Sequence, residues 1–468
     1  MSAAGAKRPA HNLMSSTLKP DGPSGAGAKR LRRTPMLSSS SGRDERVVVT
    51  GLGVVSPIGV GVDAFWKNAL AGRSGISAIP AFDGLPLEGY RSQVAGQVLD
   101  FDAGQLPAGV HVERLDRYAQ FALLAAREAL EDAGLGLERE NPYRVGVIMG
   151  AGMGGMLIGE EEFTKLYRNL RPNRVHPNFI PMITLNSASG IVAITFGAKG
   201  VNQTISTACS SSAHAIGQAL TCIRAGRADV IVAGGADASL TPLTFAGFCS
   251  LRALSTAFND APARASRPFD RARDGFVMGE GAGMLILESL GHALRRKARI
   301  YAEVAGYAAT SEAHHMVIPK QDGSEMAVTM ELALRDAGVP PAQVDHINAH
   351  ATATPIGDPV EVTAIRRLFK ARADRILVNA TKSMIGHTLG AAGAVGGITC
   401  VLALRTGLVH PTINYDDPDP ACELGGISTE AQERPLAVAV LNAFGFGSNN
   451  AVVVFKKSPA ATASRRWR

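Results

Sequence analysis

The chain has 468 residues, of which 46% are hydrophobic, 19% charged and 5% aromatic, so fibrous and intrinsically disordered classes are excluded. The net charge of +7 comes from the ends, since residues 1–45 hold eight Lys/Arg against three Asp/Glu and residues 456–468 hold five against none. The body between them carries −3, which argues against a nucleic-acid-binding protein.

The first segment, residues 1–45, is basic and rich in Ala, Ser, Gly and Pro. Two interpretations fit it: a plastid or mitochondrial transit peptide, or a start codon set too early, with Met14 or Met36 as the true start. Residues 457–468 form a second basic tail. No secretory signal or membrane span is predicted.

The five cysteines are odd in number and show no C-x-x-C spacing, so neither disulfides nor zinc are expected. We expect a reducing compartment, the bacterial cytoplasm, unless residues 1–45 direct the chain to an organelle.

The body is predicted to alternate strands and helices. The segment 118–133 has apolar residues three and four apart, as in an amphipathic helix. This alternation predicts an α/β protein with a largely parallel sheet. The strand-like, β-branched runs lie at 46–53, 145–149, 229–235, 284–288, 376–379, 436–442 and 451–455.

Two segments repeat one pattern. Residues 206–226 and 379–407 each begin with a polar turn, continue as a long small-residue helix and end in Arg-x-Gly. Residues 383–404 contain no Asp, Glu, Lys or Arg. We expect two helices buried on all sides, in two packed copies of one α/β motif.

The stretch Gly150-Ala-Gly-Met-Gly-Gly155 fits the G-x-G-x-x-G pattern of dinucleotide-binding loops. The acidic residue expected about 20 positions later is missing, because residues 163–228 contain no Asp or Glu. A glycine-rich turn between a strand and a helix is therefore predicted, and no nucleotide cofactor.

Cys209 lies between a strand-like segment and the first buried helix. A thiol there faces the free N–H groups of the helix, which favour the thiolate. From this context alone, a nucleophile and an inert buried cysteine are equally good interpretations. Cys222 and Cys400, inside apolar helices, are interpreted as packing residues.

Three other polar side chains stand at predicted strand-to-helix turns. His350 follows the strand-like 344–348, and Lys382 and His387 lie at the start of the second buried helix. Each is flanked by Gly, Ala or Thr, which predicts that they converge on one pocket.

Five segments together are similar to one known family. TACSSSAHAIG, RASRPFDRARDGFVMGEGAG, NAHATATPIGDPVE, TKSMIGHTLGAAGA and NAFGFGSNN, in this order, resemble the elongating β-ketoacyl-[acyl-carrier-protein] synthases of the thiolase superfamily. The resemblance implies a five-layer αβαβα fold built from two duplicated halves, here residues 46–298 and 299–456. It also implies a homodimer.

The resemblance implies a role for each matching residue. Cys209 would be the acyl-accepting nucleophile, His350 and His387 the donors to the malonyl thioester oxygen, and Lys382 an electrostatic organiser with Glu361 as its partner. The backbone N–H groups of Cys209 and Phe446 would form the oxyanion hole.

Further positions match the substrate-binding parts of the family. Thr352 and Thr354 would bind the pantetheine arm, Phe446 would gate the acyl pocket, and Arg252 would contact the acidic carrier protein. Two positions depart from the family pattern: Gly396 stands where a glutamate is usual, and Ser448 where a glycine is usual. The first leaves no carboxylate for a monovalent-cation or hydrogen-bond role there.

The expected activity is a β-ketoacyl-[acyl-carrier-protein] synthase, an acyltransferase that extends fatty acids by two carbons through decarboxylative condensation with malonyl-ACP. Acyl carrier protein is the expected partner, and no cofactor or metal is expected. A ketosynthase of polyketide or specialised lipid synthesis, and a non-catalytic partner subunit, are the alternatives.

Overall fold

The computed structural model describes residues 45–80, 82 and 87–458. The two basic tails, and with them the question of a transit peptide or a later start, lie outside the described residues except for Glu45, Lys457 and Ser458.

A large mixed sheet of 11 strands is built from two halves with the same strand order. The first half has the order β6-β5-β7-β9-β1 and the second β12-β11-β15-β16-β10. The parallel and antiparallel pairs also correspond between the halves. The strands are β1 (Val47–Ser56), β2 (Gly59–Val60), β5 (Val145–Gly150), β6 (Asn202–Ile205), β7 (Val230–Asp237), β9 (Gly281–Ser289), β10 (Ala302–Ser311), β11 (His346–Asn348), β12 (Leu377–Asn379), β15 (Val438–Gly445) and β16 (Asn449–Lys456).

This duplication confirms the thiolase-like α/β architecture. The prediction of a largely parallel sheet is wrong, because β9 and β16 are each antiparallel to both of their neighbours. The two halves meet where β1 pairs with β10. The exact domain boundary at 298/299 stays a prediction.

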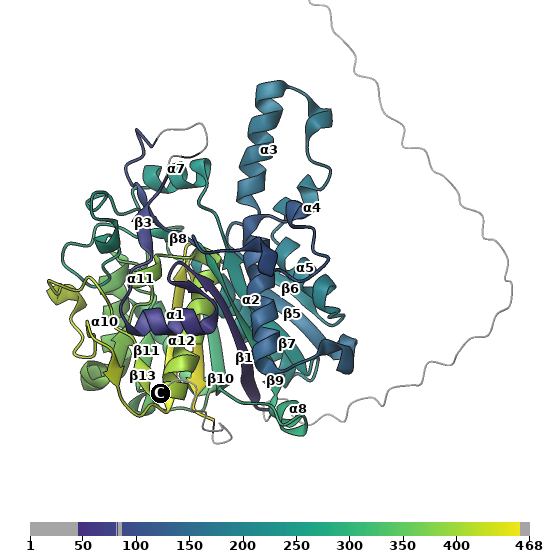
Figure 1. The fold of residues 1–468 in the computed structure, drawn as a ribbon. Helices are drawn as coiled ribbons and strands as arrows, with labels where there is room; N and C mark the ends of the chain where they lie inside the picture. The colour runs from purple at the N-terminus through teal and green to yellow at the C-terminus, as the bar shows by residue number, and fades with distance from the viewer. Residues whose placement is uncertain (1–44, 81, 83–86, 459–468) are drawn as a thin grey trace, which may run out of the picture. The chain divides into compact units, whose positions relative to one another are not determined.

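The helices form layers on and between the two halves (Figure 1). Helices α2 (Arg117–Ala133) and α5 (Ser187–Phe196) cover the first half, and α9 (Ser324–Asp336) with α10 (Gly357–Phe369) the second. Between the halves lie α6 (Ser211–Arg224) and α12 (Ala392–Thr406). The smaller elements are α1 (Val62–Leu70), α3 (Met156–Asn169), α4 (Phe179–Ile183), α7 (Pro242–Ser250), α8 (Leu290–Arg295), α11 (Lys382–Ile385), β3 (Ile76–Ala78), β4 (Val94–Gly96), β8 (Met278–Gly279), β13 (Leu408–Val409) and β14 (Gln432–Glu433).

Helix α2 matches the predicted amphipathic helix within one residue. The Asp116 carboxylate accepts a hydrogen bond from the N–H of Tyr118 at its start, and Gly134 ends it with a φ of 60°. Strand β1 packs closely against it, since a Cβ at Gly53 would lie 1.9 Å from the carbonyl oxygen of Ala125.

Helix α12 is buried on all sides from Ala392 to Leu404, as predicted, but the prediction is wrong for α6, whose Gln218 and Thr221 are exposed. Small residues let the two helices touch, because a Cβ at Gly393 of α12 would lie 2.6 Å from the backbone nitrogen of Ala213 in α6. The stretch Leu389–Thr406 is apolar enough to span a membrane, with a mean hydropathy of 1.5, but 89% of it is buried inside the protein. It is therefore a core helix.

Candidate active site

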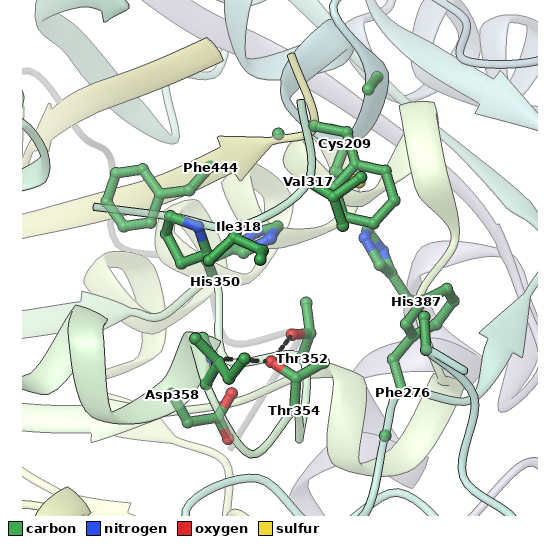
Figure 2. Close-up of a pocket in the computed structure, with 18 of the residues that line it drawn as sticks. Cys209, Phe276, Val317, Ile318, His350, Thr352, Thr354, Asp358, His387 and Phe444 are labelled. Carbon is green, nitrogen blue, oxygen red and sulfur yellow. Dashed lines mark hydrogen bonds between the residues drawn. The ribbon is translucent and has the colours of Figure 1, made fainter. Parts of the chain in front are cut away.

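A pocket of about 600 Å³ lies where the two halves meet, and both contribute to its wall. Figure 2 shows Cys209, His350 and His387 around this pocket. Of the sequence-predicted residues, these three, Glu361, Thr352, Thr354, Phe446 and Arg252 line it. Lys382 is buried behind the wall.

Cys209 lies in the short 3-10 helix η6 (Ala208–Ser210), directly before α6. Two hydrogen bonds shape the turn: the N–H of Thr207 donates to the Ser211 hydroxyl, which donates to the carbonyl of Ala208. Ala208 has a φ of 52°, an unfavourable conformation for a residue with a side chain. The strained turn carries the thiol into the pocket.

The expected lowering of the Cys209 pKa is wrong. Burial raises the pKa of this thiol to about 11, and the charge of Asp237 adds to the rise. The backbone N–H of Phe446 and the Lys382 ammonium act in the opposite direction. Burial outweighs them, so the thiol is protonated in the resting site at neutral pH.

The rings of His350 and His387 are neighbours in the pocket wall, with centroids 5.5 Å apart and planes at 85°. Burial lowers the pKa of both well below the usual value, and the Lys382 charge lowers them further. Both imidazoles are therefore neutral near pH 7.

The hydrogen bonding of His387 fixes its tautomer. Its Nδ1 accepts a hydrogen bond from the N–H of Leu389 at 3.3 Å, so the ring proton is on Nε2. This Nε2–H has no partner among the described residues. A buried, unused donor beside the cysteine is suited to a substrate oxygen.

Lys382 begins α11 and is fully enclosed. Burial lowers its pKa to about 8, and Glu361 is the group that most opposes this. Glu361 makes no ion pair with Lys382 within 4.0 Å among the described residues; its carboxylate accepts the N–H groups of His350 and Ala351 instead. Glu361 therefore acts on Lys382 through its charge and without an ion pair, and its hydrogen bonds hold the His350 turn.

The turn after β11 is strained and held by two buried carboxylates. Ala351 and Ala353 have φ values of 30° and 67°. Glu361 accepts the N–H of Ala351 at 2.7 Å, and Asp358 accepts that of Ala353 at 3.1 Å. Both carboxylates come from the start of α10. Sequence reasoning missed Asp358, although its motif contains this carboxylate among small residues.

Thr352 and Thr354 line the pocket side by side. Their hydroxyl oxygens are 3.3 Å apart, and the N–H of Gly357 donates to Thr354 (Figure 2). Apolar side chains of Val317, Ile318 and Ile356 lie in the same wall. The pocket therefore offers hydroxyl groups next to an apolar surface.

Phe446 and Arg252 also line the pocket. Phe446 is in the tight turn between β15 and β16, and Arg252 is exposed just after α7. Ser448 in this turn has a φ of 65°, which explains why glycine is usual there. Its hydroxyl donates to the carbonyl of His315 at 3.0 Å and so joins the turn to the 312–318 loop.

The glycine-rich stretch after β5 binds a carboxylate of the protein itself. The buried Asp237 accepts the N–H groups of Gly152 and Met153, and also that of Gly390 next to His387. This stretch is a turn between a strand and a helix, as predicted, and Asp237 occupies its donors. Sequence reasoning missed Asp237, which lies at the end of a uniformly apolar strand.

Comparisons with known proteins agree with this geometry. Models described as the β-ketoacyl synthase N-terminal and C-terminal domains match residues 44–293 and 301–416. The chain belongs to the β-ketoacyl synthase family. As a β-ketoacyl synthase it is an enzyme of the acyltransferase type, like its curated relatives.

Two of these relatives are bacterial. The 3-oxoacyl-[acyl-carrier-protein] synthase 2 of Coxiella burnetii is 43% identical over 412 residues, which cover 88% of this β-ketoacyl synthase and 98% of that protein. The protein of the same name from Staphylococcus aureus strain COL is 43% identical over 421 residues, covering 89% and 100%.

Solved ketosynthase structures share the fold. A type II polyketide ketosynthase in complex with its acyl-carrier protein has a TM-score of 0.82 and 37% identity, covering 88% of this chain and 99% of that one. A β-ketoacyl synthase from Burkholderia phymatum has a TM-score of 0.82 and 33% identity, covering 88% and 100%.

Proposed function

We propose that the chain condenses malonyl-ACP with an acyl chain carried on Cys209, in fatty-acid elongation. The observation that carries the proposal is the unused Nε2–H of neutral His387 beside the Cys209 thiol. The 43% identity to 3-oxoacyl-[acyl-carrier-protein] synthases, against 37% to the polyketide ketosynthase, supports fatty-acid elongation.

In the first half-reaction the Cys209 sulfur attacks the thioester carbonyl of acyl-ACP. The C–S bond to the carrier arm breaks, and the Cys209 proton ends on the departing thiol. The N–H groups of Cys209 and Phe446 stabilise the tetrahedral oxyanion. The Lys382 ammonium lowers the free energy of the thiolate while the proton is in transit.

In the second half-reaction malonyl-ACP loses CO₂. The electron pair of the breaking C–C bond forms an enolate, whose oxygen accepts hydrogen bonds from His350 and His387. The enolate carbon attacks the Cys209 thioester, and the thiolate leaves and regains a proton. The product is a β-ketoacyl-ACP two carbons longer, and no metal or redox cofactor takes part in these steps.

Two variants of Cys209 test the roles. Cys209→Ser should lose acyl transfer, whereas Cys209→Gln should still release CO₂ from malonyl-ACP but form no condensed product. CO₂ release and product are measured separately with purified carrier proteins. Equal behaviour of the Cys209→Ser variant and the unmodified enzyme would disprove the proposal.

A series of acyl-ACP chain lengths tests the choice between fatty-acid and polyketide substrates. We expect turnover of saturated acyl chains. Turnover of poly-β-keto chains alone would favour the polyketide alternative.

We propose that the acidic carrier protein docks at the pocket mouth through Arg252, and that Thr352 and Thr354 bind the pantetheine arm. The exposed Arg252 lies in the wall through which the arm must enter. The polyketide ketosynthase described above was solved with its carrier protein, which supports a carrier-protein partner.

We propose further that two copies form a homodimer. Strand β6 is at the end of the sheet, and no strand in the described part of the chain pairs with its outer edge. Exposed apolar side chains from α3, α4 and α5 belong to the same half: Phe163, Tyr167, Ile180 and Ile194. A second copy on this side would cover both.

We propose the bacterial cytoplasm as the compartment. All five cysteines are free, which fits a reducing compartment, and the curated relatives named above are from bacteria. A plastid or the mitochondrial matrix is the alternative compartment if residues 1–45 are a transit peptide.

A further inference from the structure

Gly396 replaces the glutamate that is usual in the family, and its neighbours leave no room for a side chain. A Cβ built on Gly396 would lie 2.6 Å from Oδ1 of Asn348 and 2.7 Å from a methyl carbon of Leu441. Real Cβ contacts are almost never this short, so a carboxylate at this position would displace Asn348. The residues present therefore do not fit a monovalent cation that needs this carboxylate.

A chain of hydrogen bonds between uncharged side chains occupies the interior beside Gly396. Asn348 Nδ2 donates to Asn379 Oδ1 at 2.9 Å and to Thr381 Oγ1 at 2.8 Å. His346 Nε2 lies 3.0 Å from the same Asn379 oxygen, and His410 Nε2 lies 3.0 Å from the Thr381 oxygen. All five side chains are buried.

The proton positions along this chain are consistent. His410 Nδ1 donates to the carbonyl of Pro411 at 2.8 Å, so its Nε2 accepts from the Thr381 hydroxyl. The Thr381 oxygen in turn accepts from Asn348. Burial lowers the pKa of His346 and of His410 to about 4, so both rings are neutral at physiological pH.

This series of hydrogen bonds connects the beginnings of the two turns that carry His350 and His387. Asn348 ends β11, two residues before His350. Thr381 directly precedes Lys382, in the turn that leads on to His387. The hydrogen bond between Asn348 and Thr381 thus links the two histidine-bearing segments behind the pocket wall.

We propose that Asn348 and Thr381 are positioning residues, whose neutral bridge sets the spacing of His350 and His387 without a monovalent cation at this place. The bridge holds the two turns at a fixed spacing by direct hydrogen bonds. Because Gly396 has no side chain, Asn348 has room to form these bonds. The positioning role rests on the function proposed above, whereas independence from cations does not.

The first test is thermal unfolding of the full chain in KCl, NaCl and choline chloride at equal ionic strength. A cation that binds only the folded protein raises the unfolding midpoint. We expect the three midpoints to agree within about 1 °C, whereas a cation present at 100 times its Kd would raise the midpoint of a chain of this length by about 3 °C. A selective rise of several degrees in K⁺ or Na⁺ would overturn the cation-free site.

The second test compares Thr381→Val with Thr329→Val. Both remove a buried hydroxyl, but Thr329 is in α9, where its hydroxyl donates to the carbonyl of Glu325 and lies 2.6 Å from the Thr310 hydroxyl, away from the Asn348 bridge. Thr381→Val should slow CO₂ release from malonyl-ACP by about 10- to 100-fold, as expected for misplaced donors. Cys209 acylation should stay within about twofold, because the hydrogen bonds that shape the Cys209 turn are made by Thr207, Ala208 and Ser211.

The controls separate the possible failures. Thr329→Val and Thr381→Ser, which keeps the bridging hydroxyl, should retain CO₂ release. If Thr381→Val does not fold, His410→Phe removes the end acceptor of the bridge, together with the donor to the Pro411 carbonyl, and should show the same selective loss. Equal loss in both half-reactions, or no loss of CO₂ release, would refute the positioning role. Absence of CO₂ release in the unmodified enzyme would instead refute the proposed function.

Discussion

At the residue scale, the protonated state of the Cys209 thiol has a measurable consequence. With a pKa of about 11, the thiolate fraction rises about tenfold per pH unit between pH 7 and 9. Labelling of Cys209 by iodoacetamide should accelerate accordingly, as measured by mass spectrometry, with Cys209→Ser as the control. A labelling rate that does not change above pH 7 would mean that the N–H groups at the start of α6 already keep the Cys209 thiol ionised.

The Glu361 carboxylate should set the alkaline limit of activity through Lys382. Because Glu361 raises the pKa of Lys382 against burial, its removal lowers this pKa from about 8. The Lys382 charge is present below its pKa and lost above it, so Glu361→Gln should move the alkaline limb of the pH–rate profile to lower pH. The overall rate should also fall, since Ala351 loses its acceptor. An unchanged limb would show that Lys382 does not control it.

At the element scale, close contact between α6 and α12 depends on glycine. Gly393→Ala would place a methyl group 2.6 Å from the Ala213 nitrogen and should reduce the free energy of unfolding by about 1–3 kcal/mol. The matched control is Gly247→Ala in α7, where no atom lies within 4 Å, and a gain of about 0.5–1 kcal/mol is expected. Urea unfolding measures both. Equal effects of the two substitutions would contradict this packing.

The elements most accessible to sequence reasoning were those with a strong pattern. The period of α2 and the lack of charge in α12 predicted both helices correctly, and the repeated segment predicted the duplicated halves. Strand direction was not predictable, because alternation along the chain does not say which strands become neighbours. The strand-like segment 344–348 does contain strand β11, although only three of its residues belong to the strand.

Site residues that stand in recognisable motifs could be predicted, whereas residues that act through contacts formed only in the folded interior could not. Cys209, His350 and His387 follow strand-like segments and do line one pocket. Asp358 and Asp237 hold backbone N–H groups from distant segments, so their contribution depends on the folded chain. The direction of the Cys209 pKa was wrong because enclosure cannot be read from local sequence.

At the scale of the whole molecule, the proposed homodimer makes a direct prediction. Ile194 on α5 is 78% exposed in one chain, so Ile194→Asp should place an uncompensated charge in the interface and shift the protein to monomers. Leu294→Asp on α8, where the leucine is also exposed, should stay dimeric. Sedimentation velocity distinguishes them. A monomeric unmodified enzyme would exclude the homodimer.

The burial of α12 also determines the order in which the chain can mature on the ribosome. This apolar helix is synthesised before β15 and β16, the strands that complete the sheet against which it packs. Until Val438–Lys456 leaves the exit tunnel, α12 can pack only against earlier elements such as β9 and α6, and the face that later meets β15 and β16 stays exposed. Exposed apolar surface of this kind attracts chaperones and aggregates. Nascent chains that stop before Val438 should therefore be the ones that cellular quality control removes.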